Sequence, residues 1–244
     1  MIQLYSQRNR SLPERQGIWL AINDNNGQRH TGIVLRVSLN TPALFLHLGF
    51  HHDLRCDEVT SGNWRDYYSW LECPGFDAEE QLMFAVWLES IWNANRNSVP
   101  YGITFSGTGY FDRITGMFSA SATGAGLTCA TFVMAVFADF ELPIIEFDTW
   151  IGRDSDQGFF QMIVNALESL VAVGKATRVH VDSQIEALGK APRFRPEEIV
   201  SAGGGYLGSP VPFVTAELLA RHLLQDLLVI DSDCRTEAQP QLVA

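Results

Sequence analysis

Three short apolar segments near the N-terminus constrain the fold most, because turn-forming residues bound each of them. They cover residues 17–22, 31–38 and 43–50 and are rich in Val, Ile, Leu and aromatic side chains. Residues 23–27 (Asn-Asp-Asn-Asn-Gly) predict a hairpin turn, and residues 40–42 (Asn-Thr-Pro) predict a second break. With further strands expected at residues 54–60 and 67–71, this part of the chain predicts an antiparallel β-meander.

The pattern becomes helical after residue 76. Asp77 and Glu80 have the spacing of a capping box, and apolar residues at helical spacing follow, which predicts a helix over residues 77–95. Residues 97–126 are dense in Gly, Ser, Thr and aromatics, as is typical of a functional loop. The Pro and Gly residues within 193–213 predict a surface loop or lid. Further helices are expected at residues 129–142, 156–173 and 215–229.

These elements predict an α+β fold in which the β-meander packs against helices. The 244 residues contain no internal repeat and no Ser/Gly-rich linker. We therefore expect one structural domain, with residues 1–145 as its core and residues 146–244 as a helical and loop extension packed on that core.

The charge balance excludes some partners. The 28 acidic and 17 basic residues give a net charge of -11, which disfavours nucleic acid and anionic lipid surfaces. No stretch resembles a signal peptide or reaches the roughly 18 apolar residues of a membrane span, so we expect a cytoplasmic protein. The four cysteines lack a C-x-x-C pair and are expected as free thiols, and no cofactor fingerprint appears.

Cys129 stands where a thiol becomes reactive. It follows the flexible sequence Gly-Ala-Gly-Leu-Thr at the predicted start of a helix, with Thr128 as the expected cap. The unpaired N–H groups of a helix N-terminus stabilise a thiolate and can also bind an oxyanion. The alternative is that Cys129 is a small core residue on an apolar helix.

His47 lies in the middle of a predicted strand, on the face opposite Leu44, Leu46 and Leu48. A two-residue hairpin loop at positions 52–53 would place Glu58 directly opposite His47, where its carboxylate could orient the imidazole. Glu72, on the next aromatic segment, is the alternative partner. A slip of one residue in register would reverse this choice.

A zinc-type site formed by His47, His51 and Asp53 is a further possibility from residue type and spacing, although a regular strand puts neighbouring side chains on opposite faces. The other histidines, His30, His180 and His222, show no partner pattern. We expect them on the surface.

The sequence around Cys129, Gly-Leu-Thr-Cys-Ala-Thr-Phe-Val, resembles the nucleophile helix of NlpC-like papain-fold cysteine peptidases, whose motif runs Asp/Tyr-Cys-Ser-x-Phe-Val. His47-Leu-Gly-Phe is similar to that family's His-Val-Gly-Ile strand. Because His47 precedes Cys129, the order matches the circularly permuted branch, which includes lecithin:retinol acyltransferase-like proteins. The similar segments cover residues 44–60 and 100–137. Thr128 departs from the motif, and residues 145–244 have no counterpart.

This resemblance implies a permuted papain-like fold with Cys129 as nucleophile, His47 as base and Glu58 as the polar third residue. It implies a thiol hydrolase, either an amidase or peptidase or an acyl esterase, or an acyltransferase, acting on an amide or ester carbonyl without a cofactor or metal. The extension would set the substrate or bind a protein partner. The competing hypotheses are a noncatalytic papain-like interaction protein and a metal-dependent hydrolase using His47, His51 and Asp53.

Overall fold

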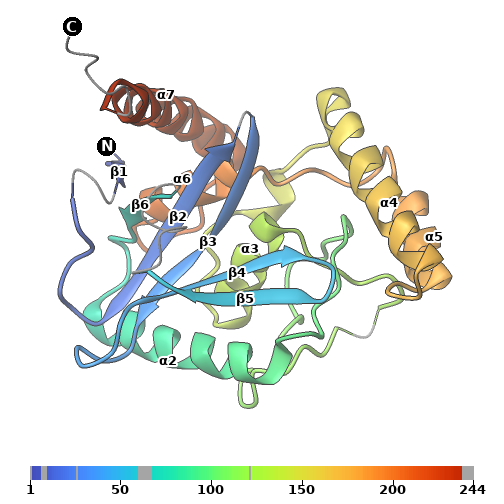
Figure 1. Ribbon diagram of the computed structural model, residues 1–244, viewed down its shortest axis with the longest axis horizontal. Coiled ribbons are helices and arrows are strands. Elements are labelled where there is room, and N and C mark those ends of the chain that lie inside the picture. The colour runs from blue at the N-terminus through green and yellow to red at the C-terminus, as the bar shows by residue number, and fades with distance from the viewer. Residues whose placement is uncertain (1, 7–9, 26, 60–67, 121, 238–244) are drawn as a thin grey trace, which may run out of the picture.

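The protein forms a six-stranded antiparallel sheet with helices packed against it (Figure 1), as predicted for an α+β fold. The computed structural model describes residues 2–6, 10–25, 27–59, 68–120 and 122–237. The strands are β1 (Tyr5–Ser6), β2 (Gly17–Asn25), β3 (Gln28–Arg36), β4 (Leu44–Phe50), β5 (Asp53–Glu58) and β6 (Ser69–Glu72). The helices are α2 (Ala78–Asn95), α3 (Cys129–Asp139), α4 (Gln157–Ala172), α5 (Arg178–Ala187), α6 (Pro196–Gly205) and α7 (Phe213–Glu237).

The strand order is β1-β6-β2-β3-β4-β5. Strands β2 to β5 form the predicted meander, since each pairs antiparallel with the next. The chain then crosses back, so that β6 pairs with the outer side of β2 and β1 pairs with β6. Part of the predicted strand at residues 54–60 and of that at 67–71 falls outside the described residues.

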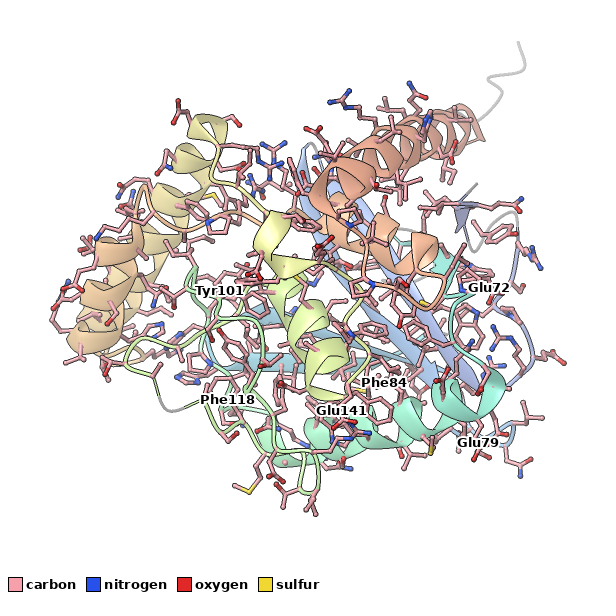
Figure 2. All side chains as sticks on the ribbon, turned by 180° about the vertical axis from the view of Figure 1, so that it is seen from behind. Glu72, Glu79, Phe84, Tyr101, Phe118 and Glu141 are labelled. Carbon is pink, nitrogen blue, oxygen red and sulfur yellow. The ribbon has the colours of Figure 1, made fainter. Side chains whose placement is uncertain are left out.

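The two faces of the sheet carry different side chains. On one face, residues such as Leu20, Ile33 and Leu46 join the apolar side chains of α2, α3 and α6 in the main core. Figure 2 shows this helix-covered side, where Phe84 of α2 packs against Phe137 of α3 with ring centroids 4.6 Å apart. The other face carries a smaller cluster that includes Trp19, Val34, Phe45 and Trp70.

The predicted helix starts at Asp77 and Thr128 are confirmed. Asp77 accepts hydrogen bonds from the backbone N–H groups of Glu79 and Glu80, and the Glu80 carboxylate accepts from the Asp77 N–H, which completes the capping box. These signals are local, so the sequence alone is sufficient to locate them.

The prediction of a surface loop or lid over residues 193–213 is wrong, because residues 196–205 of that segment form the largely buried helix α6. Pro196 occupies its first turn, where a missing N–H leaves no helical hydrogen bond unmade. A Cβ atom at Gly203 would lie 2.1 Å from Leu20 Cδ1 of β2. The glycines therefore permit close packing of α6 on the sheet instead of marking a flexible loop.

The main core continues across position 145. It contains side chains of α6, including Ile199 and Val200, together with sheet residues and α3. The extension thus supplies part of the wall behind the sheet, while α4 and α5 lie to one side of it (Figure 1). In the part of the chain that the structure describes, none of the helices has the length and apolar character to cross a membrane.

Candidate functional site

Cys129 is the first residue of α3. Thr128 caps this helix: its Oγ1 accepts a hydrogen bond from the Thr131 N–H at 3.2 Å, and Thr131 Oγ1 accepts from the Thr128 N–H at 2.7 Å. The cap fixes the first turn of the helix, and Cys129 is 6% exposed. The predicted position of this thiol at a helix N-terminus is confirmed.

Opposing influences act on the Cys129 thiol. Burial raises its pKa above the ordinary value, and this is the largest effect. The backbone N–H groups of Thr31 and Ala130, together with the positive charge of Arg193, act in the opposite direction. Because burial dominates, the thiol is neutral at pH 7 in this structure and needs a base to become a nucleophile.

His47 is buried in the middle of β4 and both ring nitrogens have partners. Nδ1 lies 2.8 Å from His30 Nε2, and Nε2 lies 3.2 Å from Asp57 Oδ2. Since a carboxylate can only accept, Nε2 of His47 carries the proton given to Asp57, and Nδ1 accepts from the His30 N–H. Burial lowers the pKa of His47 and lowers that of His30 to about 3, so both rings are neutral at pH 7.

The predicted partner of His47, Glu58, is wrong. The hairpin loop lies at residues 51–52, so His47 faces Arg55 while Glu58 faces Leu44 on the other side of the sheet. Asp57 sits diagonally from His47 on the same face. The residue opposite His47 is therefore residue 55 instead of residue 58. Because this register shift is an odd number of residues, it moves Glu58 to the opposite face of the sheet.

Glu72 is wrong as the alternative partner of His47. It forms an ion pair with Arg15 at the far side of β2.

Three consecutive residues of β3 connect Cys129 with His47. His30 hydrogen-bonds His47, the Thr31 N–H contacts the Cys129 sulfur, and Gly32 packs directly on His47. A Cβ atom at Gly32 would lie 2.6 Å from His47 Cβ, so only glycine lets β4 approach this closely. Among the described residues no hydrogen bond joins the sulfur to the imidazole, and Nδ1 of His47 is occupied by His30.

Two further histidines hold the chain that leads to Cys129. His51 Nδ1 accepts from the Tyr101 N–H at 3.1 Å, and His180 Nε2 lies 2.8 Å from the Tyr101 carbonyl oxygen. Tyr101 in turn forms a bridge with Leu127, two residues before Cys129. The expectation that His30 and His180 are surface residues without partners is therefore wrong, whereas His222 is exposed as expected.

The geometry does not assemble the metal site suggested for His47, His51 and Asp53. His47 pairs with Asp57, His51 contacts the Tyr101 backbone, and Asp53 forms an ion pair with Arg55. Within residues that the structure places, no group of three His, Cys, Asp or Glu side chains is arranged to hold an ion.

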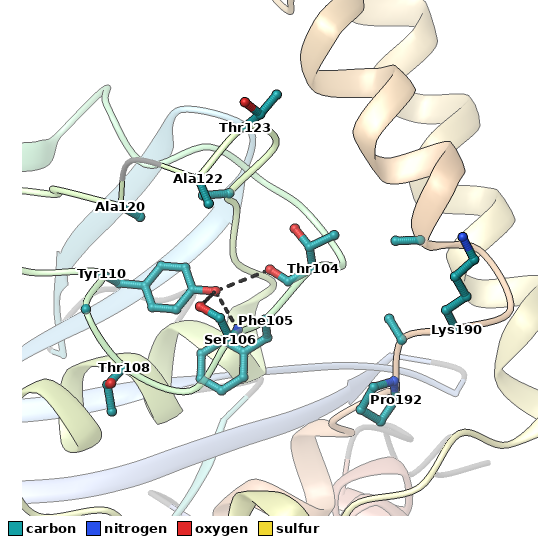
Figure 3. A pocket seen from close by; sticks show the side chains of 14 residues that line it. Thr104, Phe105, Ser106, Thr108, Tyr110, Ala120, Ala122, Thr123, Lys190 and Pro192 are labelled. Atoms are coloured by element: carbon teal, nitrogen blue, oxygen red, sulfur yellow. Dashed lines mark hydrogen bonds between the residues drawn. The ribbon is translucent and has the colours of Figure 1, made fainter.

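A pocket of about 560 Å³ opens between the loop before Cys129 and the segment that follows α5 (Figure 3). Its wall combines small and hydroxyl-bearing side chains with the ring of Phe105, and Lys190 is the charged residue among those lining it. The hydroxyl of Tyr110 accepts the Ser106 N–H at 2.9 Å, which fixes one wall. Residues of the predicted functional loop at 97–126 thus line part of this pocket.

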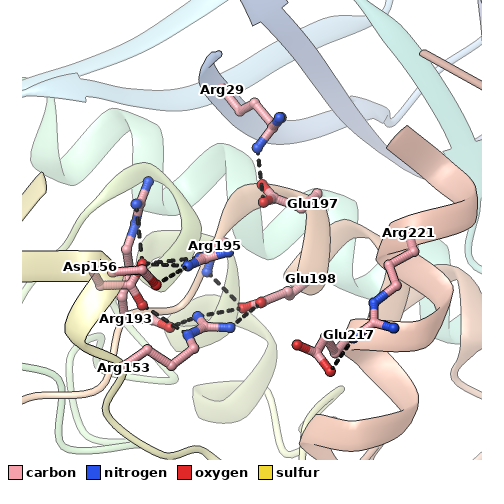
Figure 4. Close-up of polar contacts among 10 residues, drawn as sticks. Arg29, Arg153, Asp156, Arg193, Arg195, Glu197, Glu198, Glu217 and Arg221 are labelled. Atoms are coloured by element: carbon pink, nitrogen blue, oxygen red, sulfur yellow. Dashed lines mark hydrogen bonds and ion pairs between the residues drawn. The ribbon is translucent and has the colours of Figure 1, made fainter. Parts of the chain in front are cut away.

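Buried ion pairs join the segment before α4 to the start of α6 (Figure 4). Asp156, which is fully buried, accepts from Arg153, Arg193 and Arg195, and Glu198 pairs with Arg153. Sequence reasoning missed this cluster because its members lie about forty positions apart in the chain. The only hint in the sequence was the pair of arginines at positions 193 and 195.

Comparison of the chain with protein-family models, with curated proteins and with solved structures gives no match.

Proposed function

We propose that the protein is a thiol hydrolase or acyltransferase in which Cys129 attacks an amide or ester carbonyl with His47 as its base. The observation that carries this proposal is the arrangement along β3. His30 and Gly32 contact His47, and the N–H of Thr31 between them lowers the pKa of Cys129, although Cys129 and His47 lie 82 positions apart in the sequence.

The protonation states support His47 as a base. A neutral imidazole with Nε2–H donated to Asp57 presents Nδ1 as its basic nitrogen, and Asp57 would stabilise the imidazolium once Nδ1 is protonated. The thiol proton would pass to Nδ1 as the sulfur forms its bond to the carbonyl carbon. The N–H groups at the start of α3 would stabilise the resulting oxyanion.

The second half of the reaction follows from the same groups. The imidazolium gives its proton to the leaving amine or alkoxide, and the carbon–heteroatom bond breaks to leave a thioester on Cys129. His47 then activates water in a hydrolase, or an acceptor hydroxyl or amine in an acyltransferase. Attack by this nucleophile releases the acyl group and restores the thiol.

His30 must leave Nδ1 before this nitrogen can receive the thiol proton. The structure therefore corresponds to a resting arrangement within the proposal, in which the His30 N–H occupies the place of the thiol. The proposal thus requires His30 to turn away before Cys129 and His47 can form a pair.

Alkylation of cysteines tests the proposal without knowledge of the substrate. We would measure iodoacetamide labelling of Cys129 from pH 5 to pH 9 by peptide mass spectrometry, with Cys56 and Cys73 as internal references. Burial raises the pKa of each reference thiol to about 12. We expect Cys129 to label fastest, and to slow in His47→Asn and Asp57→Asn variants that retain the wild-type melting temperature.

A noncatalytic interaction protein is the second candidate, favoured by the burial of Cys129 and by the occupation of Nδ1 by His30. It predicts that Cys129 labels no faster than the reference thiols at any pH, and that His47→Asn leaves its rate unchanged. That result would replace the catalytic proposal.

The substrate class and setting remain part of the proposal. Cys56, Cys73 and Cys129 are free thiols, which supports a reducing compartment such as the cytoplasm. We propose a peptide, amide or acyl-ester substrate, with the extension at residues 146–244 contributing to its binding or to that of a protein partner.

A further inference from the structure

The pocket between the loop before α3 and the segment after α5 has the size of a small-molecule site. Its volume of about 560 Å³ falls within the roughly 300–1,000 Å³ that ligand pockets occupy. One wall comes from residues within 104–125, and the other comes from residues within 187–192. Figure 3 shows Lys190 on the opposite side of the pocket from Tyr110. A small molecule therefore fits between the two walls.

Hydrogen bonds within the protein fix both walls. The Asp139 carboxylate of α3 accepts from the three consecutive backbone N–H groups of residues 109–111, at 2.5, 2.9 and 2.7 Å. On the other side, the fully buried Gln184 of α5 accepts from the Ile103 N–H at 2.7 Å and donates to the Gly124 carbonyl oxygen at 2.6 Å. Binding of a ligand therefore needs little further ordering of the pocket, which favours affinity.

Most of the lining offers apolar surface. The Phe105 ring stacks on Tyr110 with ring centroids 5.3 Å apart, and Tyr110 is itself buried, so this side of the pocket is a rigid aromatic pair. The remaining apolar lining consists of the Pro192 ring and alanine methyl groups, from Ala120, Ala122, Ala125, Ala187 and Ala191. These walls suit a ligand with an apolar body.

Lys190 supplies the charge of the site. Its side chain is exposed, and among the described residues its ammonium has neither a hydrogen bond nor an ion pair. Of the described residues that line the pocket, none is acidic. The hydroxyl groups of Thr108 and Thr123 add neutral donors to the same lining. One unpaired cation beside neutral donors matches a ligand with a single negative charge.

We propose that this pocket binds a small apolar carboxylate, with the carboxylate at Lys190 and the apolar body against Phe105 and the alanines. A single charge is favoured over a phosphate dianion, because one ammonium balances one charge in a protein whose net charge is -11. The inference concerns binding, and it holds whether or not Cys129 is catalytic.

Three probes separate the charged end of such a ligand from its apolar body. Hydrocinnamate carries both, hydrocinnamamide replaces the carboxylate by a neutral amide, and propanoate lacks the ring. We would measure Kd by ligand-observed NMR titration of the full-length protein. We expect a Kd on the order of 1 mM for hydrocinnamate, roughly fivefold weaker binding of the amide, and the weakest binding for propanoate. Octanoate, measured alongside, tells whether an aliphatic body binds as well as an aromatic one.

Two lysine variants test the role of the charge. Lys190→Gln should bring the Kd values of hydrocinnamate and hydrocinnamamide together. Lys175→Gln is the matched control, because it removes the other lysine of the chain, which stands in the same Gly-Lys-Ala sequence after α4. It should leave the difference between the acid and the amide unchanged.

Two alanine variants test the location. Ala122→Leu and Ala191→Leu add bulk to opposite walls, and each should weaken binding of both the acid and the amide several-fold. Because Ala122 is exposed and Ala191 is half-buried, both variants should keep the wild-type melting temperature.

Several results would overturn the inference. It fails if the acid and the amide bind equally tightly, or if Lys190→Gln and Lys175→Gln reduce their difference alike. It also fails if both leucine variants keep the wild-type Kd, since the ligand would then bind elsewhere, or if neither hydrocinnamate nor octanoate gives saturable binding. Alkylation of Cys129 is measured separately, so the proposed function can stand when this inference fails, and the reverse.

Discussion

The two faces of the sheet differ in what they bury, although they share the same strands. Leu46 of β4 points into the main core against the helices, whereas its neighbour His47 points to the other face and enters a polar chain with His30 and Asp57. A face packed by helices offers few polar partners to a histidine. The face without helices accommodates a hydrogen-bonded chain among aromatic side chains, so the apolar core and the candidate base lie on opposite sides of the sheet.

The largest expected effect on stability comes from truncating Leu46, the neighbour of His47 that faces the main core. Leu46→Ala should reduce the free energy of unfolding by about 2–5 kcal/mol, because it removes buried methyl groups and leaves a cavity. Urea unfolding followed by circular dichroism measures this change.

His47→Ala is the matched substitution on the other face. We expect it to destabilise the protein less than Leu46→Ala and to slow alkylation of Cys129. Equal losses of stability, with no change at Cys129, would contradict the division between the two faces.

Gly32 of β3 lies directly beside β4, against His47, and Gly32→Ala should have the next largest effect. The added Cβ would lie 2.6 Å from both His47 Cβ and the Leu46 carbonyl oxygen, so β4 must move away. Overpacking of this kind costs about 1–3 kcal/mol. Gly27→Ala is a control for unfolding by urea, because it meets no atom within 4 Å in the β2–β3 turn, although its φ of +84° adds local strain.

The polar chain also predicts a pH dependence of stability. The pKa of His30 is lowered to about 3 in the folded protein from 6.5, so between these values the unfolded chain binds more protons. The free energy of unfolding should therefore fall as the pH decreases from 6.5 toward 4, and should be fully retained above 6.5. His30→Asn should flatten this part of the stability profile, and an unchanged profile would place the dependence elsewhere, for instance at His51, whose pKa is lowered to about 4.

The substitution that should disturb the structure least is His30→Phe, and it tests whether His30 blocks the base. His30→Phe keeps a flat ring next to His47 but removes the donor to Nδ1, which frees this nitrogen for the Cys129 thiol. We expect faster iodoacetamide labelling of Cys129 at pH 7 with little change in melting temperature. Slower labelling would mean that His30 supports the base instead of occupying its place.

Local signals made much of the fold predictable. The strands of the meander and the caps Asp77 and Thr128 depend on residues a few positions apart, and the structure confirms them. The placement of Cys129 at a helix start and of His47 on the face away from Leu46 follows from the same short-range patterns.

Features that depend on contacts between distant residues could not be predicted from the sequence. The β4–β5 turn is fixed by His52, whose φ is +58° and whose N–H donates to the Val99 carbonyl oxygen, and by the His51 contact with Tyr101. No Asn-Gly or Asp-Gly pair marks this turn. The sequence therefore could not predict the strand register, nor that Asp57 instead of Glu58 is the partner of His47. The role of Gly203 in α6 likewise depends on a distant residue, because this glycine makes room for Leu20 of β2.

Trapping of an acyl group on Cys129 tests the central claim most directly. We would treat the protein with p-nitrophenyl acetate at pH 7 and quantify acetylated peptides over time by mass spectrometry, in wild type, Cys129→Ser and His47→Asn. The account predicts transient acetylation of Cys129 that depends on His47, with p-nitrophenol released in step. Acetyl groups confined to lysines, or an acetylated Cys129 that forms equally fast in His47→Asn, would contradict it.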